Sequence, residues 1–288
     1  MLVIEAVKGI CAAFGPTIKG NAPIASARAV RWQKGGVAIC LALTWLSLAQ
    51  AALAADDRRA REIVDRAARL FVSRSSIATV EMQITKKDFQ RTISMRLWSL
   101  GEAKILVRIL QPPEDAGTAI LKVGNKTRIY LPKANRTVEM PASMMVTPWM
   151  GSDFTLDDLV NQSRLSDDYV ITTSFEGRRD GIAVSEYTLT PKPAAAVVWG
   201  KIVLEIRNAD LMPIWQRYYD EDGKPVRELS FSGYKTVSTS SRFGRLIPTR
   251  LVMRPLGQTG QQTTITYEDI VFDRPISEET FSLRNLKP

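Results

Sequence analysis

Histidine is absent from this sequence of 288 residues, and cysteine occurs only at Cys11 and Cys40. Without histidine there is no Ser-His-Asp triad, no HExxH zinc site and no imidazole base for catalysis near neutral pH. The sequence after Cys40 has no thiol, which excludes cysteine nucleophiles and Cys-zinc clusters there. No G-x-S-x-G, P-loop or G-x-G-x-x-G string occurs. Hydrolases built on carboxylates or on a Ser-Lys pair are the enzyme classes left, and we expect a non-enzyme with no cofactor and no metal.

Residues 35–54 contain no charged side chain and follow a basic stretch over residues 28–34. They end in Ala52-Leu-Ala54, with small residues at the positions that a signal peptidase reads. We therefore predict a signal peptide over residues 1–54, cleavage after Ala54 and export to the periplasm. The alternative is an uncleaved anchor, since about 20 apolar residues can span a bilayer. Both interpretations place the downstream chain outside the cytoplasm, because the basic flank stays inside.

Cleavage after Ala54 would leave residues 55–288, which we expect to form a single domain. These 234 residues are enough to bury a core without disulfides. Cleavage of the leader would remove five basic residues and one acidic residue, so the net charge of the chain would fall from +9 to +5. That charge is mild and no dense basic patch accompanies it, so we expect no nucleic-acid partner.

Beyond the leader, the spacing of apolar residues is first helical and then alternating. Residues 57–71 place Ala60, Ile63, Val64, Ala67 and Phe71 at helical spacing, which predicts one amphipathic helix.

After that helix, the apolar residues recur at every second position. Apolar residues alternate with polar ones over residues 93–97, 105–109 and 202–206, and turn residues separate such runs. The runs 214–219 and 226–231 flank a turn that contains Asp222-Gly223, which predicts a hairpin. About ten strands without alternating helices indicate a mainly β (α+β) fold, a curled, unclosed antiparallel β-barrel.

Residues 140–160 break the alternation. Four of the nine methionines lie between Met140 and Met150, and prolines and a glycine interrupt the segment. Thr155-Leu-Asp-Asp158 has the form of a capping box with Asp in the Glu/Gln position, and predicts a short helix through Val160.

Two interpretations of this segment stay open. A Met- and Trp-containing loop with a helix is typical of a plug that closes one end of a curled sheet. The same residues suit a lid over a ligand, because methionine side chains repack around differently shaped apolar guests. The nearby carboxylates Asp153, Asp157 and Asp158 do not have EF-hand spacing, and helix-start acids explain them better than calcium.

Several segments together resemble one known family. They are the amphipathic helix after a signal peptide, the Gly151-Ser-Asp-Phe-Thr-Leu-Asp-Asp-Leu159 segment, the hairpin from Pro213 to Arg227, and the closing Phe281-Ser-Leu-Arg-Asn-Leu286. The chain resembles the outer-membrane lipoprotein-sorting proteins, relatives of the periplasmic carrier LolA, from about Asp57 to Leu286.

The resemblance implies an unclosed barrel with an N-terminal helix and a short helical lid, whose concave apolar face binds acyl chains. It also implies a lipid or lipoprotein as partner and an inner-membrane RND-type lipid exporter beside it. The residues we expect in the apolar cavity and lid are Met144, Met145, Trp149, Met150, Phe154, Leu156, Leu159 and Trp98.

Three functions compete at this stage. The first is a periplasmic carrier of lipid or lipoprotein acyl chains in outer-membrane sorting. The second is a module that senses envelope lipids or docks on a transporter without shuttling cargo. The third is a hydrolase based on carboxylates. Fold alone does not choose among them.

Overall fold

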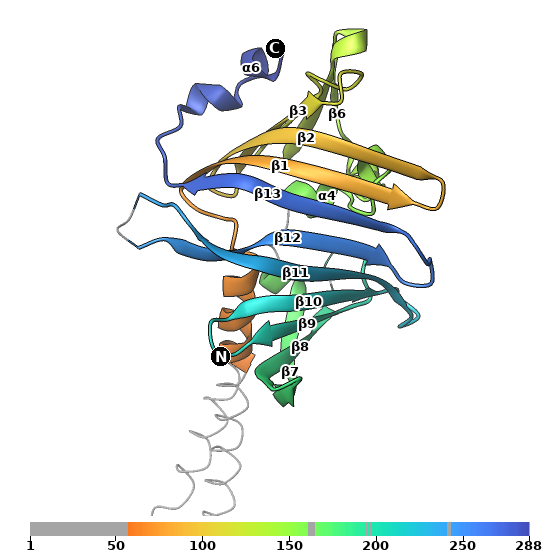
Figure 1. The fold of residues 1–288 in the computed structure, drawn as a ribbon, viewed down its shortest axis with the longest axis vertical. Helices are drawn as coiled ribbons and strands as arrows, with labels where there is room; N and C mark the ends of the chain where they lie inside the picture. Colours follow the sequence, from red (N-terminus) through yellow and green to blue (C-terminus); the bar gives the residue numbers. More distant parts are fainter. Residues whose placement is uncertain (1–56, 161–164, 194, 196, 241–242, 288) are drawn as a thin grey trace, which may run out of the picture. The chain divides into compact units, whose positions relative to one another are not determined.

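The computed structural model describes residues 57–160, 165–193, 195, 197–240 and 243–287. The predicted signal peptide lies outside the described residues. Figure 1 shows that the described chain is dominated by one large curled sheet. Within these ranges no helix has the length and apolar character needed to cross a membrane.

The sheet has thirteen antiparallel strands in the order β6-β5-β4-β3-β2-β1-β13-β12-β11-β10-β9-β8-β7. Its strands are β1 (Ser75–Lys86), β2 (Phe89–Leu100), β3 (Lys104–Gln111), β4 (Ala119–Val123), β5 (Lys126–Leu131), β6 (Arg136–Glu139), β7 (Tyr169–Arg179), β8 (Ile182–Pro191), β9 (Lys201–Arg207), β10 (Met212–Tyr219), β11 (Pro225–Val237), β12 (Arg245–Pro255) and β13 (Gln262–Phe272). This number exceeds the predicted count of about ten, because β4, β5 and β6 are too short to show a clear period of two.

The two edges of the sheet are strands that follow each other in the chain. β6 lies at one edge and β7 at the other, while the first and last strands, β1 and β13, pair in the middle. The connection over residues 140–168 therefore runs from one edge of the sheet to the other. Because β6 and β7 do not pair with each other, the barrel stays unclosed, which confirms the predicted mainly β fold class.

One face of the sheet carries the main core. Inward residues alternate along β1, where Val80, Met82 and Ile84 are buried. Residues 57–68 are helical and bury Ala60 and Val64 in this core. The predicted amphipathic helix is thus confirmed, although it ends at residue 68 and residues 69–71 form a turn.

The predicted hairpin is also confirmed. β10 and β11 pair antiparallel, with Trp215 opposite Ser230 and Tyr218 opposite Arg227. Gly223 at the turn has φ +76°, a left-handed conformation that glycine adopts without a steric penalty.

The opposite face of β2, β3 and β4 is covered by the C-terminal segment. The 3-10 helix η4 (Glu278–Phe281) and helix α6 (Leu283–Leu286) place Phe281 and Leu286 against Leu106 and Leu121. This second, smaller core explains why Leu106 is buried although it alternates with the inward-facing Val107.

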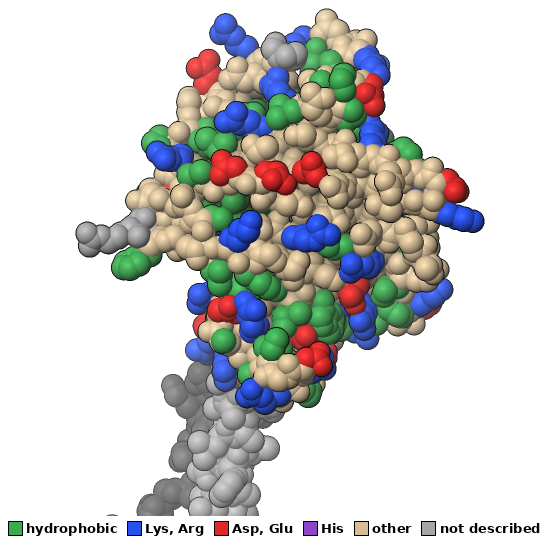
Figure 2. Space-filling model, viewed as in Figure 1, with side chains coloured by type: hydrophobic (Ala, Val, Ile, Leu, Met, Phe, Trp, Pro, Cys, Tyr) green, Lys and Arg blue, Asp and Glu red, His purple; other side chains and the backbone are tan. Residues whose placement is uncertain are grey.

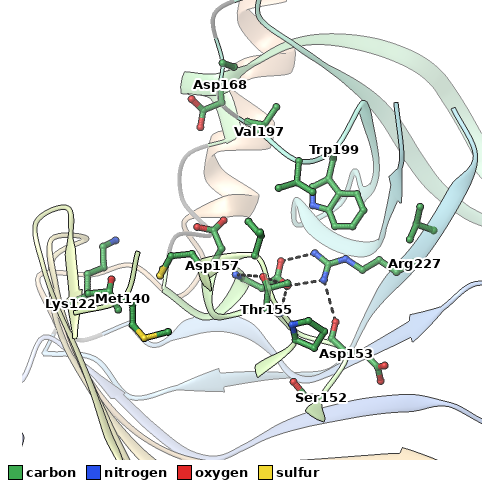
Figure 3. A pocket seen from close by; sticks show the side chains of 18 of the residues that line it. Lys122, Met140, Ser152, Asp153, Thr155, Asp157, Asp168, Val197, Trp199 and Arg227 are labelled. Carbon is green, nitrogen blue, oxygen red and sulfur yellow. Dashed lines mark hydrogen bonds and ion pairs between the residues drawn. The ribbon is translucent and has the colours of Figure 1, made fainter. Parts of the chain in front are cut away.

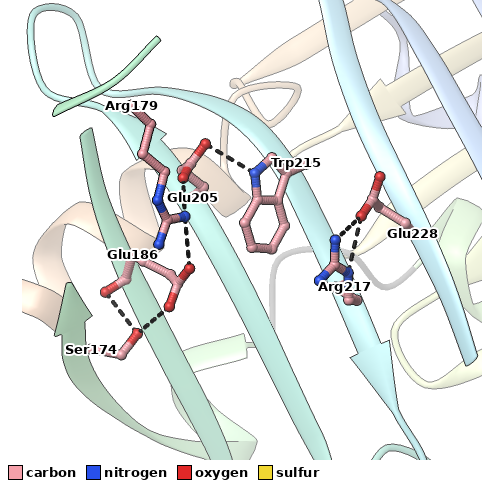
Figure 4. A network of polar contacts seen from close by, with 7 residues as sticks. All are labelled: Ser174, Arg179, Glu186, Glu205, Trp215, Arg217 and Glu228. Atoms are coloured by element: carbon pink, nitrogen blue, oxygen red, sulfur yellow. Dashed lines mark hydrogen bonds and ion pairs between the residues drawn. The ribbon is translucent and has the colours of Figure 1, made fainter. Parts of the chain in front are cut away.

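A polar network ties β7, β8, β9 and β10 together (Figure 4). Arg179 donates to Glu186 and to the buried Glu205, and Glu205 also accepts from Trp215 Nε1 at 2.9 Å. On the neighbouring pair of strands, Arg217 donates to Glu228 at 2.6 Å. These contacts cross from strand to strand, so they fix strand register as well as satisfying the charges.

Figure 2 shows the molecule from the side where β1, β13 and β12 lie in front of helix α4. Acidic and basic side chains are interspersed over this face, and backbone with side chains that are neither hydrophobic nor charged occupies much of its centre. This face is therefore the solvated side of the sheet, and the edge-to-edge connection lies behind it.

Candidate functional site

The first part of the connection contains a tight loop, which runs from helix α3 (Ala142–Met145) through the 3-10 helix η2 (Trp149–Gly151) to Thr155. Pro148 and Thr155 form an isolated antiparallel bridge, and Trp149 N donates to Phe154 O at 2.8 Å. Met150 and Gly151 both have positive φ, at 53° and 78°. The chain reversal brings Trp149 and Phe154 together in the core, where both are buried.

The capping box predicted from the sequence is present at helix α4 (Leu156–Val160). Asp158 N donates to Thr155 Oγ1 at 3.1 Å, and Thr155 N donates to Asp158 Oδ2 at 2.7 Å. The two residues thereby satisfy backbone N–H groups that a helix start would otherwise leave without partners. A carboxylate in the first turn also suits the positive end of the helix.

Asp153 fastens the loop to the centre of the sheet. It pairs with Lys86 at the end of β1, and Thr263 Oγ1 on β13 donates to its Oδ2 at 2.7 Å. Its backbone N donates in turn to Thr263 Oγ1 at 2.9 Å. This carboxylate therefore attaches the loop to two strands.

Arg227, near the start of β11, holds helix α4. Its guanidinium donates to both carboxylate oxygens of Asp158, at 2.7 and 2.8 Å, and to Asp153 O at 3.2 Å (Figure 3). The cation also lies 4.5 Å from the ring centroid of Trp199 and 4.4 Å from that of Tyr218. Burial lowers the pKa of Arg227, but the charge of Asp158 outweighs it and leaves the pKa above its usual value. Arg227 therefore stays charged at any physiological pH.

A cavity of about 1150 Å³ lies against this assembly. The connection contributes apolar residues between Met140 and Pro148 and mostly polar residues between Gly151 and Asp168 to its wall, and most of the other lining residues come from both halves of the sheet. One side is formed by the β2–β3 and β4–β5 turns, and the other by residues 195 and 197–199 and the ends of β11 and β12. Figure 3 shows Met140, Val197 and Arg227 at three separate places around this space. The cavity thus occupies the gap that the unclosed sheet leaves.

The residues predicted to contact a ligand separate into three groups. Met145 lines the cavity and also belongs to the main core, in which Trp149, Phe154 and Leu156 are buried, and Met150 and Leu159 pack against that core. Met144 is 49% exposed and does not line the cavity. Trp98 lies on the other face of the sheet and packs against the second core, under the C-terminal segment.

Residues 140–160 have features of both interpretations. Trp149, Phe154, Leu156 and Val160 are buried in the main core, as in a plug. Residues 140–148 form an apolar lid portion that lines the cavity through Met140, Met145, Val146 and Pro148, and residues 151–153, 155, 157 and 158 line it as well.

Other lining residues had no distinct signal in the sequence. Lys86, Thr127 and Arg227 lie within strands of ordinary alternation, and their inward direction follows only from the pairing of those strands. Trp199 precedes β9 after a stretch of alanines and valines, and nothing in that stretch indicated a cavity.

Two tyrosines and two aspartates in and behind the cavity wall have shifted pKa values or ion-pair partners. Burial, with the negative charges of Asp168 and Asp157, raises the pKa of Tyr169 in the wall, and burial raises that of Tyr218 behind it. Both phenols stay neutral, so neither can serve as a base near neutral pH. The carboxylates of Asp153 and Asp158 are engaged in ion pairs.

Three solved structures share this architecture. A domain from Vibrio parahaemolyticus named for outer membrane lipoprotein sorting is 24% identical, with a TM-score of 0.69 over 81% of this chain and 100% of its own. A DUF1329 family protein from Desulfovibrio piger is 20% identical, with a TM-score of 0.72 over 81% and 99%. The LolA superfamily protein NE2245 from Nitrosomonas europaea is 18% identical, with a TM-score of 0.64 over 78% and 98%. These matches establish a LolA-like fold, and the expected structural resemblance is confirmed.

A family model described as "-like: Uncharacterized protein" matches residues 101–288. The chain belongs to this family. The matched range contains the whole edge-to-edge connection, Arg227 and the C-terminal segment. Among curated proteins, the comparison gives no match.

Proposed function

We propose that this protein is a periplasmic carrier that binds the acyl chains of a lipid or lipoprotein and works beside an RND-type exporter in outer-membrane sorting. The observation that carries the proposal is the cavity of about 1150 Å³ in the gap of a LolA-like sheet, with an apolar lid portion over residues 140–148. The fold of a domain named for lipoprotein sorting supports the same class of cargo. The role is non-catalytic and needs no cofactor, metal or nucleic acid.

The energetics suit a carrier with a covered site. Each buried methylene contributes about 0.8 kcal/mol, so one long acyl chain supplies on the order of 10 kcal/mol of transfer free energy. A site in which all of this transfer free energy contributed to binding would not release its cargo. The lid portion, with Met140, Met145 and Val146 on the cavity wall, competes with a guest for the same surface and so lowers the net affinity.

Native mass spectrometry of protein purified from its own envelope, without detergent, tests cargo binding. We expect a co-purifying mass of an acyl lipid or a lipoprotein. A Thr127→Trp variant fills the cavity from β5, and we expect it to lower lipid occupancy about tenfold. Val170→Trp is the matched control, because Val170 lies on β7, is 45% exposed and does not line the cavity. An apo protein that also ignores added acyl ligands overturns the proposal.

Transfer separates a carrier from the competing module that senses lipid or docks on a transporter. Loaded protein is mixed with acceptor vesicles, and labelled lipid is measured in the vesicles after the protein is removed. A carrier delivers lipid to the acceptor. Lipid that stays on the protein under all conditions contradicts shuttling and favours the sensing or docking module.

A further inference from the structure

A second cavity, of about 110 Å³, lies behind the first. Its wall is largely apolar, with Leu70 and Phe71 after the N-terminal helix and Leu204 and Leu229 from the sheet. One water needs about 10–15 Å³ of such space, so this cavity is several times larger than a single water site. Asp157, Asp158 and Gln216 supply the polar part of the wall, and the remaining apolar surface can contact a hydrocarbon guest.

The two cavities share part of their walls. Asp157, Asp158 and Trp199 line both of them, so the partition between the cavities is about one side chain thick. The Trp199 ring lies against the Arg227 cation and, with a centroid distance of 5.2 Å, against the ring of Tyr218. Figure 3 shows Trp199 beside Arg227 rather than within the hydrogen-bonded group around Thr155. Among the described residues, Trp199 thus contacts the Arg227 cation and the Tyr218 ring, and it also packs against the main core.

We propose that the second cavity receives the methyl end of a bound acyl chain and that Trp199 separates it from the main cavity, so that this partition sets the preferred chain length. The inference rests on the proposed acyl-binding function and adds to it a specificity-determining residue. The Trp199 ring is held by a tilted contact with Tyr218 and by the Arg227 cation, whereas Asp158 is held by a nearly buried ion pair, which favours Trp199 over Asp158 as the element that moves. The last carbons of a long chain then enter an apolar space that a short chain does not reach.

Affinity measured against chain length tests this proposal. Lysophosphatidylcholines of increasing length compete with an apolar fluorescent probe on the purified protein. Each added methylene that finds apolar space tightens binding about fourfold. We expect this gain to continue in the wild type until the second cavity is full and then to stop.

An Ala68→Leu variant fills the second cavity from the helix side without touching the first. We expect its gain in affinity to stop about three carbons earlier than in the wild type, while short chains bind equally well. Arg66→Leu is the control, because Arg66 is exposed on the same helix and lines neither cavity. A Trp199→Ala variant joins the cavities, and we expect the gain to continue to longer chains.

The outcomes distinguish this inference from the function beneath it. If no chain of any length binds, the proposed function fails. If acyl chains bind but the affinity of the wild type, Ala68→Leu and Arg66→Leu proteins stops rising at the same chain length, the second cavity takes no part and the inference is wrong. If Ala68→Leu weakens all chain lengths equally, the effect is on the fold of the site, and the assignment of the methyl end is also overturned.

Discussion

Arg227 on strand β11 donates two hydrogen bonds, of 2.7 and 2.8 Å, to the carboxylate of Asp158 in helix α4. The side chains are 7% and 13% exposed, so the ion pair is nearly buried, and 69 residues separate the partners in the chain. The same carboxylate completes the capping box with Thr155. One side chain thus joins the start of a short helix to the sheet, at the point where the two cavities meet.

Replacing Arg227 with methionine tests the importance of this contact. The change keeps a long apolar side chain but leaves the Asp158 carboxylate buried without its cation, and we expect a loss of about 3–5 kcal/mol in the free energy of unfolding. Urea unfolding followed by circular dichroism measures it. Arg250→Met on β12 is the control, because Arg250 is exposed, and a similar loss there would contradict the assignment.

The capping box predicts a smaller effect at Thr155. Thr155→Val removes the hydroxyl that accepts from Asp158 N, and we expect a loss of about 1 kcal/mol in stability. Chemical unfolding of the purified variants measures this loss. Thr155→Ser keeps the hydroxyl and should stay close to the wild type. Equal stability of the valine and serine variants would show that the box contributes nothing to α4.

Asp210 gives the protein a defined response to acid. Its carboxylate accepts two hydrogen bonds from Arg207, at 2.8 and 2.7 Å, and these lower its pKa below the ordinary value. A carboxylate whose pKa is lowered in the folded state stabilises the fold at every pH above its unfolded-state pKa of about 4. This stabilisation is lost as the pH falls through the folded-state pKa. We expect Asp210→Asn to cost about 1 kcal/mol at pH 7 and nothing at the lowest pH where the fold persists.

Thermal unfolding of both proteins from about pH 7 down to about pH 3 measures this difference. The difference in unfolding temperature between the wild type and Asp210→Asn should narrow only below about pH 4. A gap that is constant over the whole range would mean that the asparagine variant fails for a reason other than its charge.

The C-terminal segment is expected to stabilise the sheet through Phe281. Phe281 is 5% exposed in the second core, and Phe281→Ala should cost about 3–5 kcal/mol and expose the apolar surface around Leu106. Unfolding and the fluorescence of a surface-binding apolar dye measure the two effects. Leu283→Ala in the same segment is the control, because Leu283 is 55% exposed and should change neither.

Local features of the fold were predictable because they depend on near neighbours. The helical spacing of Ala60, Val64 and Ala67 placed a helix correctly, and the spacing of Thr155 and Asp158 placed a capping box whose hydrogen bonds are present. The turn at Asp222-Gly223 identified the β10–β11 hairpin for the same reason. Each of these patterns acts over a few residues, so a short stretch of sequence contains all of the partners.

Whether a side chain faces a cavity could not be predicted from the sequence. Trp98 stands on a strand whose alternation is correct, but the alternation cannot say that the C-terminal segment covers its face. Trp149 and Phe154 were expected in the ligand site as part of an apolar segment, yet the reversal at Met150 and Gly151 turns them into the core.

Periodicity and turn residues were thus sufficient for the class of elements, the antiparallel arrangement and the special character of residues 140–160. They could not tell which of those residues face a cavity, or that Arg227 holds them through Asp158; both depend on the folded sheet. A period reports which side chains share a face, whereas the contacts of that face depend on pairing between strands far apart in the chain. The cavity lies between the two halves of the sheet, and no short stretch of sequence contains both of its sides.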